Sequence, residues 1–380
     1  MRRVHGRPVA AALGGSVQGV SRATVIESDA GSALVYPFRA PKPGSLTEVA
    51  PGILWLRMPM PIALNHINLY LLAAGDGWLV VDTGPATAEA IALWEALFQG
   101  PLAGVRIAGV VCTHFHADHS GLARMLCERS GAPLLMTSRE YFWRRAWPGA
   151  IDEMPAEHAA FYHEGGYPPE LTRDANDFFT SLNLVQPIPM SFRRLREQDP
   201  LPGTDDDWRV LVGHGHSPEH AMLYCGPRRV LVSGDQLLPQ ISTNISVTAI
   251  DPTAEPLADW LASLERLLAI PDETLVLPAH GLPFRGIRSR VEQLQSHHAR
   301  VLRRTLAACA QGPRSAFDVS KVLFPGPLAG IAHVLALGES LAHLQHLVRG
   351  GELVSALDDS GVRRYRACRI PHTTNGEEHD

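Results

Sequence analysis

The stretch Thr113-His114-Phe115-His116-Ala117-Asp118-His119 brings three imidazoles and one carboxylate within six positions. It directly follows an apolar run from Ile107 to Cys112, which is typical of a buried strand. Neutral imidazole nitrogens and carboxylate oxygens are ligands of a borderline metal ion such as Zn²⁺. Alternation along an extended segment puts the first two histidines on one face, and a turn at Ala117 would direct the last two residues toward a neighbouring point. The stretch therefore predicts ligands for two adjacent metal ions.

Composition excludes several classes of protein. The chain has 380 residues, of which 45% are hydrophobic and 19% are charged, so it is large enough for one large globular domain and a smaller one. Its net charge of −5 gives no overall attraction to nucleic acid or to an anionic membrane, although a local basic patch is not excluded. No apolar run approaches the roughly 18 residues of a membrane span. Gly14 and Gly15 interrupt a short apolar patch before it reaches signal-peptide length, so we expect a cytoplasmic protein without a membrane partner.

Strand and helix patterns alternate along most of the chain. Strands are expected at residues 53–58, 67–72, 78–81, 107–112 and 133–136, and again in a second strand-rich half over 208–277. Helices are expected at residues 87–98, 120–129 and 256–268. This alternation predicts a layered α/β core.

Changes of pattern divide the chain. We expect an N-terminal arm over residues 1–45, a catalytic domain over 46–288, a C-terminal domain over 289–370 and a tail over 371–380. Helical patterns at 291–310, 316–323 and 339–349 precede a hairpin pattern at 352–366, which is the order of a winged-helix module. Within the catalytic domain, residues 139–198 are rich in aromatic side chains, which indicates a mostly helical insertion. The aromatic residues either pack this insertion onto the core or form a lid beside the site.

Further ligand candidates follow other apolar runs. The glycine-rich stretch Val212-Gly213-His214-Gly215-His216-Ser217-Pro218-Glu219-His220 carries three histidines. Ser233-Gly234-Asp235 ends another strand with a carboxylate, and Ala279-His280 ends a third with an imidazole. Strand ends are suitable positions for a site, because rigid strands fix the direction of the side chains that follow them.

These motifs resemble those of the metallo-β-lactamase superfamily of metal-dependent hydrolases. Five motifs occur in the family's order over roughly residues 50–288. They are Asp82-Thr83-Gly84, the His114 to His119 cluster, Gly215-His216, Ser233-Gly234-Asp235 and Ala279-His280. The resemblance implies an αββα sandwich with a dinuclear site at one sheet edge. The stretch from Gly338 to Leu344 is similar to the winged-helix extension that one branch of the superfamily carries.

The resemblance also implies a role for each motif residue. One metal ion would be held by His114, His116 and His216. The second would be held by Asp118, His119 and His280. Asp235 would bridge the two ions, and Asp82 would accept a hydrogen bond that orients a ligand.

The third motif departs from the usual Thr-Pro-Gly-His form. His214 stands where proline is common, and His220 lies four residues after His216. Three histidines therefore compete for one ligand position. We favour His216 because it follows Gly215, and we leave open whether His214 and His220 are loop residues or contact the substrate.

The expected function is that of a dinuclear metal-dependent hydrolase. Two metal ions about 3.5–4 Å apart would share a water, and the bridging hydroxide would attack a small ester, thioester, lactone or amide. Asp118 would pass a proton to the leaving group. Zn²⁺ is the default ion for this ligand set, although iron and manganese also accept it.

Other functions remain open at this point. The alternative is a phosphodiesterase or nuclease whose C-terminal domain contacts nucleic acid. Its candidate phosphate-binding residues are Arg349, Arg363, Arg364, Arg366 and Arg369. A solvated face is the simpler explanation for these arginines. A mononuclear iron oxygenase is disfavoured because such enzymes use only part of the seven-ligand set. A homodimer formed through the tail is a further option, and no motif identifies the substrate.

Overall fold

The computed structural model describes residues 21–22, 34–62, 64–146, 154–171, 186–204, 207–328 and 331–368. The chain divides into two compact units. The first comprises Met1–Asp152, Phe179–Asn244 and Ala258–Gln295. The second comprises Glu153–Phe178, Ile245–Leu257 and Ser296–Asp380. The expected arm over 1–45 lies mostly outside the described residues, and the tail over 371–380 lies wholly outside them.

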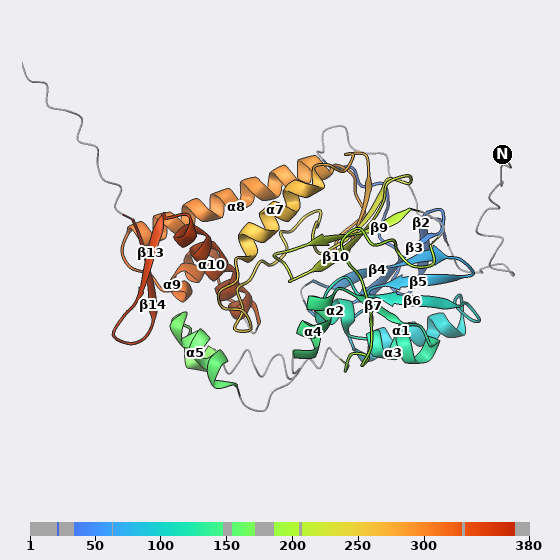
Figure 1. The fold of residues 1–380 in the computed structure, drawn as a ribbon, viewed down its shortest axis with the longest axis horizontal. Coiled ribbons are helices and arrows are strands. Elements are labelled where there is room, and N and C mark those ends of the chain that lie inside the picture. The colour runs from blue at the N-terminus through green and yellow to red at the C-terminus, as the bar shows by residue number, and fades with distance from the viewer. Residues whose placement is uncertain are drawn as a thin grey trace, which may run out of the picture. The chain divides into compact units, whose positions relative to one another are not determined.

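Two sheets form the centre of the first unit (Figure 1). The larger sheet has the strand order β1-β2-β3-β4-β5-β6-β7-β8, and the smaller has the order β12-β11-β10-β9. The strands of the larger sheet are β1 Ser21–Arg22, β2 Leu46–Ala50, β3 Ile53–Pro59, β4 His66–Ala74, β5 Gly77–Val81, β6 Ile107–Val111, β7 Leu134–Met136 and β8 Arg193–Arg194. The strands of the smaller sheet are β9 Trp208–Gly213, β10 His220–Cys225, β11 Val230–Gly234 and β12 Leu275–Pro278.

Alternating side chains separate two apolar cores. On β3, Leu54 and Leu56 pack beneath helices α1 (Ala88–Gln99) and α3 (Ala123–Ser130). Trp55 lies between them in sequence and faces the opposite way, into the core between the two sheets. Helix α7 (Pro256–Leu267) lies on the outer face of the smaller sheet, where its residues line a cavity together with those of β9 and β10. The order of layers is helix, sheet, sheet, helix, which confirms the expected αββα sandwich.

The strand directions bring the motifs to one edge. β5 runs parallel to β6, and β11 runs parallel to β12. β9 and β11 both run antiparallel to β10, so β9 has the same direction as β11. Each predicted metal-ligand motif follows the carboxyl end of β6, β9, β11 or β12, and Asp82 follows β5. Within each sheet, strands of one direction therefore deliver their motifs to a common edge.

Three predicted elements differ from those observed. The expected helix over 120–129 is two helices, α2 (Ala117–Ser120) and α3, because the backbone N–H of Leu122 donates to the Thr83 hydroxyl instead of continuing the helix. Helix α10 (Ile331–Arg349) begins before the expected residue 339. The insertion over 139–198 is not one body: α4 (Ser138–Ala146) and β8 belong to the first unit, whereas α5 (Ala156–Glu164) belongs to the second.

Besides α5, the described part of the second unit contains helices and a hairpin in the expected order. These elements are the end of α8 (Ile287–Ala310), α9 (Ala316–Leu323), α10, β13 (Leu353–Leu357) and β14 (Arg363–Ala367). Ser315 and Asp318 form a capping box that fixes the start of α9. Glu164 at the end of α5 pairs with Arg363 of β14 at 2.5 Å. The winged-helix assignment and the expected domain boundaries stay predictions. No helix in the described ranges is both long and apolar enough to span a membrane.

A buried imidazole pair joins α8 to α10. His298 Nδ1 lies 3.1 Å from His343 Nε2, and His343 Nδ1 donates to the Glu339 carbonyl at 2.7 Å. Burial lowers the pKa of His298 to about 3 and that of His343 to about 4. Both pKa values in the folded state lie below the ordinary 6.5. The stability that the neutral pair contributes is therefore complete above pH 6.5 and is lost as the pH falls toward 4.

We expect the free energy of unfolding to decrease by roughly 1.4 kcal/mol per pH unit per histidine in this window. Urea unfolding, followed by circular dichroism at a series of fixed pH values, measures this dependence of the free energy of unfolding on pH. In His343→Gln, whose amide keeps a donor for the Glu339 carbonyl, the free energy of unfolding should change less with pH. Equal slopes in the two proteins would contradict the assignment.

Candidate metal centre

The first ligand motif is held by main-chain and side-chain hydrogen bonds at the end of β6. Asp82 Oδ1 accepts from the Thr113 backbone N–H at 2.8 Å, and Asp82 Oδ2 accepts from His119 Nδ1 at 2.8 Å. Asp82 has a left-handed backbone with φ of 61°. Such a conformation is uncommon outside glycine and is tolerated best by Asp and Asn. Asp82 therefore fixes both the strand end and the ring of His119, the orienting role that the family resemblance implied.

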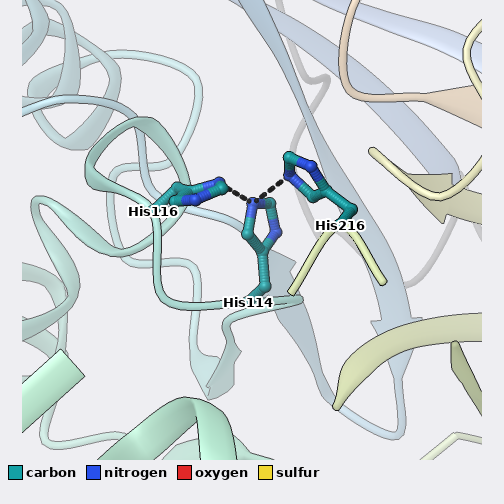
Figure 2. A group of neighbouring side chains, drawn as sticks. All are labelled: His114, His116 and His216. Carbon is teal, nitrogen blue, oxygen red and sulfur yellow. Dashed lines mark hydrogen bonds between the residues drawn. The ribbon is translucent and has the colours of Figure 1, made fainter. Parts of the chain in front are cut away.

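Three histidines from two loops face one another (Figure 2). His114 Nε2 lies 2.8 Å from His116 Nδ1 and 3.2 Å from His216 Nε2. His216 Nδ1 donates to the Asn244 carbonyl at 2.8 Å, which leaves its Nε2 directed at the other two rings. The structure thus brings together all three residues expected to hold one ion.

A second group lies beside the first. Asp118 Oδ2 is 3.5 Å from His119 Nε2 and 3.3 Å from His280 Nε2. His280 Nδ1 donates to the His66 carbonyl at 2.8 Å, so its Nε2 also points to the centre. Asp118, His119 and His280 are therefore brought together as expected.

Asp235 reaches both groups. Its Oδ2 lies 3.4 Å from His216 Nε2, and its Oδ1 lies 3.4 Å from His280 Nε2 and 3.6 Å from His119 Nε2. One carboxylate oxygen faces each group, which is the arrangement that a bridging ligand requires.

The electrostatics divide the histidines into two kinds. Burial, reinforced by neighbouring imidazoles, lowers the pKa of His114 well below its usual range, and the same causes lower that of His116 to about 3. Burial opposes a charge on His280 as well, but Asp235 and Asp118 outweigh it and raise the pKa of His280 to about 10. Neutral imidazoles and ionised carboxylates are the forms that bind metal ions. A bound metal ion would therefore replace the proton that His280 carries between Asp235 and Asp118.

The donor set fits a metal ion. Nitrogen atoms at about 2.0–2.1 Å from a tetrahedral zinc ion lie roughly 3.3–3.4 Å from each other. The separations of 3.2 Å to 3.6 Å given above are close to this value, whereas the 2.8 Å between His114 Nε2 and His116 Nδ1 is shorter. His119 Nε2 and Asp235 Oδ1 are buried and have no hydrogen-bond partner within the described residues. Buried polar atoms without partners are rare and indicate a missing ligand or ion.

The third motif is resolved by its surroundings. His214 Nδ1 donates to the Pro218 carbonyl at 2.8 Å and joins none of the candidate ligand groups found in the described part of the chain. His220 begins β10 and is buried, with its Nε2 accepting the backbone N–H of Asp235 at 3.1 Å. Its ring also requires glycine at 234, because a Cβ there would lie 2.4 Å from His220 Cε1. Of the three histidines, His216 alone joins a candidate ligand group, and His220 supports the backbone of Asp235.

Sequence reasoning missed Asn68. This buried amide on β4 donates to the carbonyls of Pro278 and Gly281, both at 2.9 Å, and so brackets the loop that carries His280. Its Oδ1 accepts from Trp55 Nε1 at 2.9 Å. An asparagine within an apolar strand must find partners, since unsatisfied buried amides are costly. From the sequence alone, this requirement indicates that Asn68 has hydrogen-bond partners, but it does not identify them.

The family is established by comparison with known proteins. The family model described as "Metallo-beta-lactamase superfamily" matches residues 63–280, which is more than half of the chain. The chain belongs to the metallo-β-lactamase superfamily. A second model, "Metallo-beta-lactamase-like, C-terminal domain", matches residues 302–368. Membership makes the protein a metal-dependent hydrolase, and its His/Asp groups are compatible with the divalent ions that the superfamily binds.

Individual relatives agree with this family. The crystal structure of a beta-lactamase domain protein from Burkholderia ambifaria is 41% identical, with a TM-score of 0.82, over 88% of this chain and 98% of that chain. A metallo-beta-lactamase family protein from Thermus thermophilus is 29% identical, with a TM-score of 0.71, over 84% of this chain and 100% of that chain. The probable metallo-hydrolase YqjP of Bacillus subtilis is 29% identical over 78% of this chain and 92% of its own length. Each of these three relatives covers at least 78% of this chain.

Replacing Asn68 should loosen the His280 loop. In Asn68→Ala, the Gly281 carbonyl loses its side-chain donor, whereas the Pro278 carbonyl keeps the Tyr70 hydroxyl at 2.9 Å. We expect metal affinity to fall about 10- to 100-fold and the free energy of unfolding to fall by about 1–3 kcal/mol. Competition with a chromophoric chelator measures the metal affinity, and urea unfolding measures the free energy of unfolding.

The variant Tyr70→Phe is the control. It removes one hydrogen bond from the same loop and should have a smaller effect on both quantities. Wild-type affinity in Asn68→Ala would show that the amide does not orient the loop.

Proposed function

We propose that this metallo-β-lactamase superfamily member is a dinuclear hydrolase that cleaves a small ester, thioester, lactone or amide. The observation that carries the proposal is the position of Asp235 between two groups of ligand-type side chains. A mononuclear site would not require a second, complete group on the far side of that carboxylate. Zn²⁺ is the ion we expect, because three histidines make up one group and two histidines with a carboxylate make up the other.

Each group has a defined task in this proposal. His114, His116 and His216 would hold one ion, Asp118, His119 and His280 would hold the second, and Asp235 would contact both. Such a pair of cations supplies an ionised water at neutral pH and stabilises negative charge on the substrate oxygen. His114 and His119 are fully buried, so this part of the site is shielded from bulk solvent. Water exclusion strengthens every electrostatic interaction within the site.

Asp118 is the residue best placed to move a proton. Its side chain is 16% exposed, compared with 9% for Asp235 and 0% for His119, so it is the more accessible of the two carboxylates. Its pKa is lowered to about 2: burial opposes this shift, but His119 and His280 outweigh it. The group is therefore ionised at neutral pH and is able to accept a proton before passing it to the leaving group.

The apolar surroundings of His116 support an acyl substrate. The Phe115 ring lies 4.4 Å from the His116 ring and 5.5 Å from Trp143 of α4, measured between centroids. Phe115 belongs to a buried apolar core, and Trp143 packs against that core. In this proposal, apolar side chains beside a ligand suit a small ester, thioester or lactone better than a polyanion.

Three of the five arginines that the nuclease alternative would use are paired with carboxylates, whereas Arg366 is exposed. Arg349 pairs with Glu255, Arg363 pairs with Glu164, and Arg364 pairs with Asp318 and Asp358. Arginines already paired with carboxylates are poor candidates for phosphate contacts. Arg369 lies outside the described residues.

Removal of a ligand should abolish metal binding and turnover together. We expect His116→Ala and Asp235→Ala to lose bound metal, and turnover to fall by roughly 10³-fold or more, because bound cations contribute several kcal/mol to the transition state. Plasma mass spectrometry gives the metal content, and a panel of generic esters, thioesters and lactones gives the activity. His158→Ala, which changes a histidine of α5 outside the site, is the matched control. Full metal occupancy with full activity in either ligand variant would remove the proposed site.

The substrate class needs its own test. We expect hydrolysis of one or more acyl substrates in the panel and no hydrolysis of a phosphodiester. Binding to oligonucleotides should be weak at all salt concentrations. Phosphodiester cleavage together with oligonucleotide binding that decreases steeply with salt would favour the nuclease instead.

A further inference from the structure

Glu140 is a buried carboxylate whose side-chain hydrogen bonds, among the described residues, come from the ligand-bearing loops. It lies in the first turn of α4 and is fully buried. Its Oε2 accepts from the Phe115 backbone N–H at 3.0 Å, and its Oε1 accepts from the Ser217 hydroxyl at 2.7 Å and the Glu219 backbone N–H at 2.6 Å. The three donors are neutral groups, and burial removes the solvent that would otherwise stabilise the carboxylate.

The three donors flank the ligands of one metal group. Phe115 lies between His114 and His116, and Ser217 directly follows His216. One carboxylate oxygen binds the first loop and the other binds the second. Glu140 therefore joins the two loops that supply the three converging imidazoles of Figure 2.

The rest of α4 strengthens the same connection. Thr137, which directly precedes the helix, donates from its hydroxyl to the Glu219 carbonyl at 2.7 Å. Arg144 Nε donates to the Ser120 hydroxyl at 3.1 Å, and that hydroxyl donates to the Phe115 carbonyl at 2.8 Å. Both ligand loops are thus bonded to one helix, which itself supplies no candidate ligand within the described residues.

We propose that Glu140 is a positioning residue for the His114, His116 and His216 group, an inference that rests on the metal-binding function proposed above. It joins the two loops through both of its oxygens, in addition to the hydrogen bond that the Ala221 backbone N–H donates to the Thr113 carbonyl at 2.8 Å, and so it helps to set the size of the opening into which these three nitrogens converge. Hydrogen-bonded partners of ligand loops change metal affinity about 10- to 100-fold when removed. A carboxylate suits this role because each of its oxygens accepts from a different loop.

The isosteric variant Glu140→Gln separates this role from simple packing. Glutamine has the same size, but one end of its amide is an NH₂ group that cannot accept a hydrogen bond. That end must face either the N–H of Phe115 or the donors at Ser217 and Glu219. The backbone N–H of Phe115 or of Glu219 therefore loses its acceptor while the volume of the core is unchanged.

The test compares stepwise zinc affinities in the full-length protein. Zinc is titrated against a chromophoric chelator, and zinc-edge anomalous diffraction at limiting zinc identifies which group is occupied. We expect Glu140→Gln to weaken the site of His114, His116 and His216 about 10- to 100-fold and to leave the other site unchanged. Glu128→Gln, an exposed carboxylate on α3 that pairs with Arg124, is the matched control and should behave as wild type. Asn68→Ala should weaken the opposite site, that of His280.

Each remaining outcome decides the question. Unchanged affinity at both sites in Glu140→Gln would overturn the proposal, as would an equal loss at both sites in a protein whose metal-free fold is intact by circular dichroism. If Glu140→Gln does not fold, Ser217→Ala removes a single donor and should still weaken the same site selectively; equal or no weakening would overturn the proposal. If the wild-type protein binds no zinc, iron or manganese, the proposed function itself fails, and this result is distinct from the failures of Glu140.

Discussion

The site depends on one physical constraint, the position of the Asp235 carboxylate between two groups of imidazoles. Each of its oxygens faces a different group at 3.4 Å. Asp235 follows β11, in the middle of the smaller sheet, where it cannot shift without disturbing β10 and β12. His220 holds its backbone, and Gly234 leaves room for the His220 ring. A rigid strand end thus fixes the residue that both groups share.

Bringing so many ionisable groups together is unfavourable without a cation. Neutral His114 and His116 lie beside ionised Asp118 and Asp235, and burial removes the solvent that would otherwise stabilise the charges. The fold meets this cost with fixed hydrogen bonds around the site. Asp82, Asn68 and Glu140 each form a hydrogen bond with the main chain of a residue close in sequence to a candidate ligand. The surrounding residues therefore hold a geometry that the ligands alone would not adopt.

The aromatic segment over residues 139–198 illustrates a limit of composition. Its aromatic residues suggested either packing or a lid, and both interpretations treated the segment as one piece. The structure assigns α4 and β8 to the first unit and α5 to the second. The contribution of α4 to the site comes from the carboxylate of Glu140 as well as from its aromatic rings. The sequence does not show that a single glutamate in the first turn of a helix holds two distant loops, because its hydrogen-bond partners are far away in the chain.

The sequence by itself determined the family, the layered α/β core and the residues from which the site is built. Local patterns suffice for these, since an apolar run that ends in a ligand motif marks a strand end. Only the tertiary structure decided which of His214, His216 and His220 faces the site, where the helix after the motif is interrupted, and which buried polar residues hold the loops. These features depend on contacts between segments far apart in the chain, such as Thr83 with Leu122 and Asn68 with Pro278. Hydrogen bonds over such separations leave no periodic trace in a single sequence, because each partner is chosen by the packing of strands and not by its neighbours.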